Sequence, residues 1–213
     1  MKKQNFLSLT TISWVIMVVC LMFLFLQRRS LQGTIFEITT MCNHEKQHLE
    51  AKNVVLQSNL ILAKRSTGKV INGEILLTNV RNEKHTTNKI FARETPFLVF
   101  RYSETGGCSP CVNATFEHLR RLRNSVCSNK LQIIVIPHNM TLRQMMVESS
   151  LSVNSQFAFY LADEIGLGLP VDNEFVSYLT IVDRHKTSNV FVVDRMFMPL
   201  LEGYINILIE NYN

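Results

Sequence analysis

Two cysteines separated by two residues, Cys108 and Cys111, are the side chains of this chain best suited to covalent chemistry. A thiolate attacks disulfide bonds, and a second thiol three residues further along a helix can close a disulfide with the first. Apolar residues recur at helical spacing after the pair, at Val112, Phe116 and Leu119. We therefore expect Cys108 at the start of a helix, where unpaired backbone N–H groups stabilise a thiolate.

The residues before the cysteines predict the elements that position them. Phe97–Tyr102 is apolar apart from Arg101 and rich in aromatic and β-branched residues, which is typical of a strand. Gly106 and Gly107 predict a turn between this strand and the helix. Pro110 fits the first turn of a helix because an N–H there has no intrahelical partner. The sequence thus predicts a strand, a turn and a helix with two thiols at its start.

This segment, with its Gly-Gly and Cys-Ser-Pro-Cys, resembles the active-site segment of thioredoxin-like proteins, in particular the membrane-tethered TlpA/redoxin type of bacterial envelopes. The resemblance implies an α/β fold, a three-layer sandwich around a central mixed sheet. It also implies a thiol–disulfide oxidoreductase without a cofactor, in which Cys108 attacks and Cys111 resolves. Its partners would be disulfides or dithiols of envelope proteins. The active-site turn would comprise Gly106, Gly107, Ser109 and Pro110.

Three features of the pattern of this family are missing, and one of them is the tryptophan that commonly precedes the first cysteine, where this chain has Gly107. Thioredoxin-like proteins carry a cis-proline before the strand that faces the cysteines, whereas Ser177 or Tyr178 stands there in this chain. A cis bond before a residue other than proline costs roughly 3–4 kcal/mol, so we expect a trans bond. Many members also use a buried acid as a proton relay, for which the nearest candidate is Glu104, in the turn after the strand.

Two other interpretations of the Cys-x-x-Cys pair remain open. It could be half of a zinc site, although the sequence offers no second Cys-x-x-Cys or His-x-x-His to complete one. It could be a structural disulfide in a fold that has lost its activity. The domain would then be a membrane-tethered interaction module, with the missing proline as the main support for that interpretation.

The N-terminal residues predict a membrane anchor. Phe6–Leu26 is uncharged and long enough to cross a hydrocarbon core of about 30 Å. No small-residue cleavage site follows it, so we expect an uncleaved anchor over residues 1–29. Lys2 and Lys3 on one side nearly balance Arg28 and Arg29 on the other, so charge alone leaves the orientation open. The resemblance implies a single-pass protein of the bacterial inner membrane with a periplasmic domain.

Residues 30–66 are predicted to form a helical stalk, because they lack proline and carry apolar residues in a loose helical pattern. Within them, Cys42, His44 and His48 invite comparison with a metal site. The favoured interpretation is a polar stalk with two solvated histidines and a free thiol, since a fourth ligand is missing. We therefore expect no metal site.

Residues 67–213 are predicted to form the thioredoxin-like domain. Leu131–Ile136 is nearly continuously apolar, as in a central strand covered on both faces, and Pro137 is expected to end it. The net charge of +5 is scattered without interleaved aromatic residues, so nucleic acid is not an expected partner. The remaining expected elements are strands at 74–80, 156–161, 178–182 and 190–193, a turn at 183–189, and helices at 141–149 and 199–212.

Overall fold

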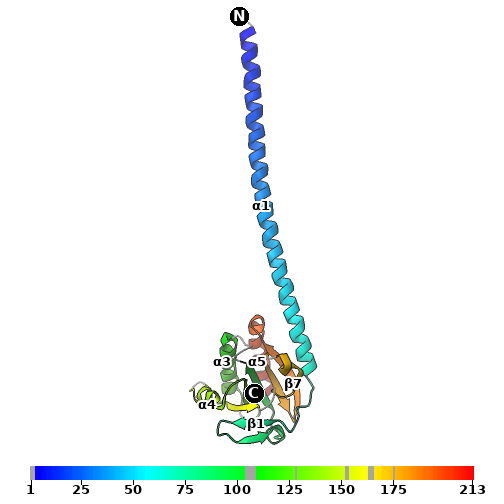
Figure 1. Ribbon diagram of the computed structural model, residues 1–213, viewed down its shortest axis with the longest axis vertical. Coiled ribbons are helices and arrows are strands. Elements are labelled where there is room, and N and C mark those ends of the chain that lie inside the picture. Colours follow the sequence, from blue (N-terminus) through cyan, green and yellow to red (C-terminus); the bar gives the residue numbers. More distant parts are fainter. Residues whose placement is uncertain (1–2, 104–108, 128, 152–153, 163–165, 175) are drawn as a thin grey trace. The chain divides into compact units, whose positions relative to one another are not determined.

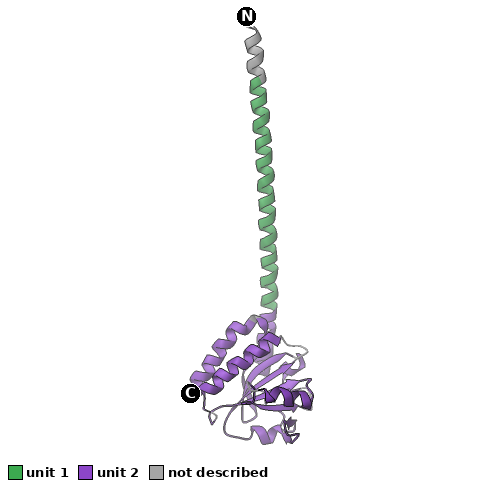
Figure 2. Ribbon diagram, turned by 90° about the vertical axis from the view of Figure 1, so that its left-hand side faces the viewer, with its two compact units in different colours: residues 1–54 green, residues 55–213 purple. Residues whose placement is uncertain are grey.

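The computed structural model describes residues 3–103, 109–127, 129–151, 154–162, 166–174 and 176–213. It contains two compact units, Met1–Val54 and Val55–Asn213, which are coloured separately in Figure 2. The boundary between the units lies within one helix, α1 (Lys3–Ser66). The limits expected at residues 29 and 66 mark changes of composition along this helix and remain predictions.

Helix α1 contains the segment predicted to be an anchor. From Ile12 onward it has a stretch long and apolar enough to cross a membrane, with a mean hydropathy of 1.7. Every side chain described from Ile12 to Val54 is exposed. The end of α1 belongs to the second unit, where Leu62 and Ser66 are buried. The Ser66 hydroxyl accepts a hydrogen bond from the Val171 N–H at 3.0 Å, which ties the helix end to the domain.

The second unit is built around a mixed sheet of seven strands (Figure 1). Strands β3 (Phe97–Ser103), β4 (Gln132–His138) and β5 (Ala158–Ala162) are parallel and central. The antiparallel strands are β1 (Leu76–Asn79), β2 (Lys84–Thr86), β6 (Ser177–Asp183) and β7 (Lys186–Val193). The order across the sheet is β2-β1-β5-β4-β3-β6-β7.

Alternation along β3 sends its side chains to two separate cores. Leu98, Phe100 and Tyr102 face the core under α3 (Ser109–Ser125) and α5 (Met198–Tyr212). That core also takes Met145 from α4 (Leu142–Ser150). Phe97 and Val99 face the other core, which is covered by α2 (Thr87–Phe91), the end of α1 and residues 167–171. Two helical layers on a mixed sheet are the three-layer sandwich that the sequence predicted.

Helix α3 begins where the apolar pattern predicted, directly after Cys108, and is amphipathic. Phe116, Leu119 and Leu122 are buried, at the three- and four-residue spacing of one helix face. The crossover from β3 through α3 to the parallel strand β4 makes the βαβ unit that parallel pairing requires. This unit fixes the first turn of α3 beside the carboxyl end of β3.

The expectation that Pro137 ends the fourth strand is wrong. Strand β4 continues to His138, and Pro137 lies opposite Tyr102 in the register with β3. The pairs between β4 and β5 stop at Val135, so Pro137 has a strand on one side only. A proline is tolerated in a strand where the sheet does not need its N–H as a donor.

The expected turn at residues 183–189 is also shorter in the structure. Arg184 and His185 adopt φ values of 46° and 70°, and Asp183 pairs with Lys186 across them. Two central residues with positive φ form the tight hairpin connection whose twist matches the flanking strands. Strand β7 therefore begins at Lys186 instead of Val190. The polar region at 79–88, for which no element was expected after the strand at 74–80, contains β2 and the start of α2.

Candidate functional site

Cys111 lies in the first turn of α3 and is almost fully buried, with 3% of its surface exposed. It is disulfide-bonded, whereas Cys20, Cys42 and Cys127 are free. Cys108 lies outside the described residues, as do Glu104, Gly106 and Gly107. The pairing of Cys108 with Cys111, the glycine turn and the Glu104 relay therefore remain predictions.

The Cys111 side chain belongs to a core rich in aromatic rings. Phe116, five residues further along α3, contacts Phe100 and Tyr102 edge-on, with ring centroids 5.4 and 5.7 Å from its own. The Cys111 carbonyl accepts a hydrogen bond from the buried Thr115 hydroxyl at 2.8 Å. Ser109 and Pro110, which precede Cys111 in α3, are exposed. The helix start is thus open to solvent at Ser109 and closed to it at Cys111.

Ser177 lies on the sheet face to which Cys111 packs. It is the first residue of β6. Residues two apart in a strand share a face, and Leu179 packs in the same core as Cys111. The Ser177 hydroxyl accepts a hydrogen bond from the Ser103 N–H at 3.3 Å, which joins the start of β6 to the end of β3. The described residues contain no cis peptide bond, so the bonds between Val176, Ser177 and Tyr178 are trans.

Tyr178 lies on the opposite face of the sheet, away from Cys111. It pairs with Arg101 across β6 and β3, and its ring belongs to the second core. Ser177 and Tyr178, which the sequence analysis gave as alternatives for the position facing the cysteines, therefore lie on opposite faces of the sheet. Of this pair, Ser177 is on the Cys111 face, and Tyr178 is part of a buried polar cluster.

That cluster is centred on an ion pair that the sequence interpretation missed. The Arg101 Nε and the Asp172 Oδ1 are 2.9 Å apart, and both side chains are essentially inaccessible to solvent. Asp172 comes from η1 (Pro170–Glu174), a short 3-10 helix in the connection before β6. A charge inside an otherwise apolar strand must be paired to be tolerated, so Arg101 itself was the available signal.

In addition to the ion pair with Arg101, three hydrogen-bond donors surround the Asp172 carboxylate. The N–H groups of Leu167 and Leu169 donate to Oδ2 at 2.9 and 2.8 Å, and the Tyr178 hydroxyl donates to Oδ1 at 2.8 Å. Burial raises the pKa of Asp172, while Arg101 and these donors act in the opposite direction. Burial and the neighbouring carboxylate raise the pKa of Tyr178 well above its usual value, so its hydroxyl stays a donor.

Gly166 allows the Asp172 carboxylate and Arg101 to approach the backbone. It has a φ of +70°, and a Cβ there would lie 2.2 Å from Asp172 Oδ1 and 2.5 Å from Arg101 Nε. Contacts this short do not occur, and the positive φ would strain any other L-residue. Position 166, which lies against the Arg101–Asp172 ion pair, therefore requires a glycine.

His138, the last residue of β4, extends the cluster toward the carboxyl ends of the parallel strands. Its Nδ1 is 3.1 Å from Arg101 Nη2, and a guanidinium can only donate, so Nδ1 is the acceptor. The imidazole is therefore neutral, with its proton on Nε2. Burial, followed by the positive charge of Arg101, lowers the pKa of His138, and Asp172 partly opposes this. In the pairing of β3 with β4, His138 lies opposite Ser103. Ser103 precedes Cys108 by five residues in the sequence.

No group of three or more His, Cys, Asp or Glu side chains is placed to hold a metal ion within the part of the chain that the structure describes. His44 and His48 lie on α1, where every described side chain up to Val54 is exposed. The functional candidates in the domain are thus the disulfide-bonded cysteine in α3 and the polar cluster under β3.

Comparisons with solved structures identify the fold as thioredoxin-like. The peroxidoxin BcpB of Mycobacterium tuberculosis superposes with a TM-score of 0.52 at 13% identity, covering 70% of this chain and 98% of that one. A secreted M. tuberculosis disulfide oxidoreductase gives 0.45 at 14% identity, covering 63% and 96%. A thioredoxin-like protein of Porphyromonas gingivalis gives 0.47 at 14% identity, covering 66% and 92%. No family model and no curated protein matches the sequence.

Proposed function

We propose that this protein is a membrane-tethered thiol–disulfide oxidoreductase that exchanges a Cys108–Cys111 disulfide with protein partners. The observation that carries the proposal is the disulfide-bonded Cys111, buried in the first turn of the helix that follows the central strand. Thiol exchange needs one accessible sulfur and one protected sulfur that resolves the intermediate. The burial of Cys111 suits it to the protected role.

The exchange would proceed in two steps that conserve electrons. The Cys108 thiolate attacks one sulfur of a partner disulfide, and the other partner sulfur leaves as a thiolate. The Cys111 thiolate then attacks Cys108 Sγ, which forms the Cys108–Cys111 disulfide and releases the second partner thiolate. The partner gains two electrons and the domain loses two. The reverse sequence oxidises a partner dithiol.

The trans bond at Ser177 favours a second candidate function. Without a proline in the cis conformation beside the cysteines, the groove that docks an extended substrate chain differs from that of thioredoxin. A domain of this kind could act as an interaction module in which the Cys111 disulfide is structural. The two functions differ in one observable, because only the oxidoreductase passes through mixed disulfides.

A trapping experiment distinguishes the two functions. In the full-length Cys111→Ala variant the resolving step is lost, so mixed disulfides through Cys108 should accumulate and be identifiable by mass spectrometry. Cys127→Ala, which removes an exposed free thiol elsewhere, is the matched control and should trap nothing. If Cys111→Ala and Cys127→Ala give the same adducts, the oxidoreductase proposal is wrong and the interaction module is favoured.

We further propose that α1 crosses the bacterial inner membrane once and that the domain lies on the periplasmic side. The apolar stretch of α1 supports the crossing, because it satisfies the length and hydropathy that a spanning helix needs. Disulfide exchange supports the orientation, because disulfides persist outside the cytoplasm. A membrane-impermeant maleimide should label the exposed Cys127 in intact spheroplasts. Labelling only after lysis would place the domain in the cytoplasm and contradict the orientation.

A further inference from the structure

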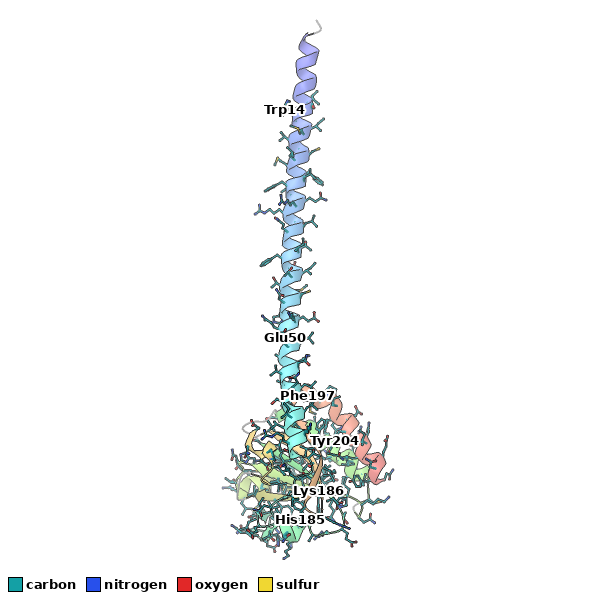
Figure 3. All side chains as sticks on the ribbon, turned by 90° about the vertical axis from the view of Figure 1, so that its right-hand side faces the viewer. Trp14, Glu50, His185, Lys186, Phe197 and Tyr204 are labelled. Atoms are coloured by element: carbon teal, nitrogen blue, oxygen red, sulfur yellow. The ribbon has the colours of Figure 1, made fainter. Side chains whose placement is uncertain are left out.

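The part of α1 between the apolar stretch and the domain carries large apolar side chains that nothing covers. Leu31, Ile35, Ile38 and Leu49 are exposed by 57, 61, 52 and 52% and share one side of the helix, and the large apolar side chains exposed elsewhere around it are Phe36, Met41 and Val54, by 74, 62 and 66%. Figure 3 shows the side chains of this helix standing outward along its length. A long helix whose apolar side chains face water gains stability when a partner covers them.

The spacing of these side chains identifies the kind of partner. Positions spaced alternately four and three residues apart form one stripe along the helix between residues 31 and 56. These positions are Leu31, Ile35, Ile38, Cys42, Glu45, Leu49, Lys52 and Leu56. Six of these eight positions are apolar, and no other register of the same period over this segment has more than four. A repeat of 3.5 residues is the seam of a left-handed coiled coil, with isoleucine, cysteine and leucine at the a and d positions.

Of the two charged members of this seam, Glu45 has an oppositely charged neighbour in a second copy of the chain, whereas Lys52 faces Lys52 of that copy. Glu45 occupies a d position, and Lys46 occupies the e position that follows it. In a parallel pair, a d side chain packs beside the e side chain of the facing helix, so Glu45 lies next to Lys46 of the partner chain. This contact is repeated by symmetry. Single polar residues within a seam also fix the alignment of the two helices.

We propose that residues 31–56 of α1 form a parallel two-stranded coiled coil with the same residues of a second copy. Two copies anchored in one membrane by the preceding apolar stretch enter this segment in the same direction and at the same height, which gives the parallel alignment. Cys42 then lies in the seam facing Cys42 of the partner chain. The proposal concerns the assembly of the protein; it rests on the proposed membrane crossing of α1 and does not depend on the chemistry of Cys108 and Cys111.

Cysteine crosslinking of the full-length protein in membranes tests the proposal. In a Cys20→Ser, Cys127→Ser background, Cys42 is the remaining cysteine with a free thiol in the structure. Copper phenanthroline with dissolved oxygen joins two facing thiols, and the two electrons pass to oxygen. We expect a disulfide-linked dimer through Cys42. With Cys42→Ser added, Leu49→Cys should restore the dimer because residue 49 lies one heptad further along the seam.

Off-seam positions supply the matched controls. His44→Cys and Gln47→Cys, each in the Cys42→Ser background, lie on the outer face and should crosslink several-fold more slowly than positions 42 and 49. Equal rates at all four positions would indicate random collision in the membrane and overturn the proposal. Adducts of Cys42 with a protein of different mass, and none with itself, would assign the seam to another partner and also overturn it.

The seam can also be broken without disturbing the domain. Ile38→Glu with Leu49→Glu should convert a dimer into a monomer, as measured by light scattering of the detergent-solubilised full chain. Thr40→Glu with Gln47→Glu adds the same two charges to the outer face and should leave the dimer intact. A monomeric unsubstituted chain, or a dimer that survives the seam substitutions, contradicts the coiled coil.

Discussion

The Arg101 guanidinium and the Asp172 carboxylate form a fully buried ion pair, with Nε and Oδ1 2.9 Å apart. The pair connects β3, the strand before the two cysteines, with η1, the short helix before β6. The pair lies on the sheet face opposite Cys111, so it supports the strand and does not contact the Cys111 side chain. We interpret it as the element that holds the second core together beneath β3.

Arg101→Met should lower the free energy of unfolding by about 3–5 kcal/mol, because it leaves the Asp172 carboxylate buried without its cation. The double variant Arg101→Met, Asp172→Asn should lose clearly less than the sum of the two single variants, since no unpaired charge remains. Urea unfolding of the full chain measures all three. Arg121→Met, which breaks the more exposed pair with Glu202, is the control and should cost at most about 1 kcal/mol. Strict additivity would show that the two charges do not interact.

Gly166→Ala should destabilise the domain by more than about 2 kcal/mol. The new Cβ would meet the Asp172 carboxylate at 2.2 Å, and the φ of +70° is unfavourable for alanine. Gly203→Ala is the matched control, because Gly203 lies inside α5 and a Cβ there meets nothing within 4 Å. That substitution should stabilise the helix by about 0.5–1 kcal/mol. Thermal unfolding of both variants would reveal the opposite signs, and equal shifts would contradict the close packing at Gly166.

Domain stability should fall as the pH drops below about 6.5, in part because of His138. Its pKa is lowered in the folded state, so the unfolded chain takes up the proton first. The stabilisation is complete above the unfolded pKa of about 6.5 and is lost as the pH falls from there toward the lower folded value. Unfolding measured from pH 7.5 to pH 5 should have a smaller slope in His138→Gln. His44→Gln, on the exposed part of α1, should leave the slope unchanged, and an unchanged slope in both variants would contradict the link.

Local patterns in the sequence predicted the elements that carry the cysteines. The apolar run of β3 and the spacing of Phe116 and Leu119 gave the strand and the helix because burial on one face imposes that spacing. The start of α4 also follows from a local pattern, a capping box formed by Thr141 and Gln144. In each of these cases, the residues that determine the helix or strand lie within a few positions of it in the sequence.

The buried polar cluster could not be predicted in the same way. Asp172 is 71 residues from Arg101 in the sequence, and it lies in the glycine-containing connection between β5 and β6. Only the crossing of that connection over β3 brings the two charges together. The expectation that Pro137 ends β4 is wrong for a related reason. A proline is tolerated at this position because the pairing of β4 with β5 stops at Val135. Both features depend on tertiary neighbours, which a single sequence does not reveal.

The last prediction concerns the two thiols of the reduced protein. Cys108 should react with iodoacetamide at lower pH than an ordinary thiol of pKa about 8.5, because it directly precedes a helix whose first N–H groups have no intrahelical partner. Cys111 should react much more slowly, since only 3% of its surface is exposed. Alkylation rates against pH, measured on variants that keep a single cysteine, test both expectations. A variant that keeps only the exposed Cys127 supplies the comparison. Equal profiles for Cys108 and Cys127 would mean that the helix start does not activate the thiol, and fast alkylation of Cys111 would remove its role as the protected, resolving sulfur.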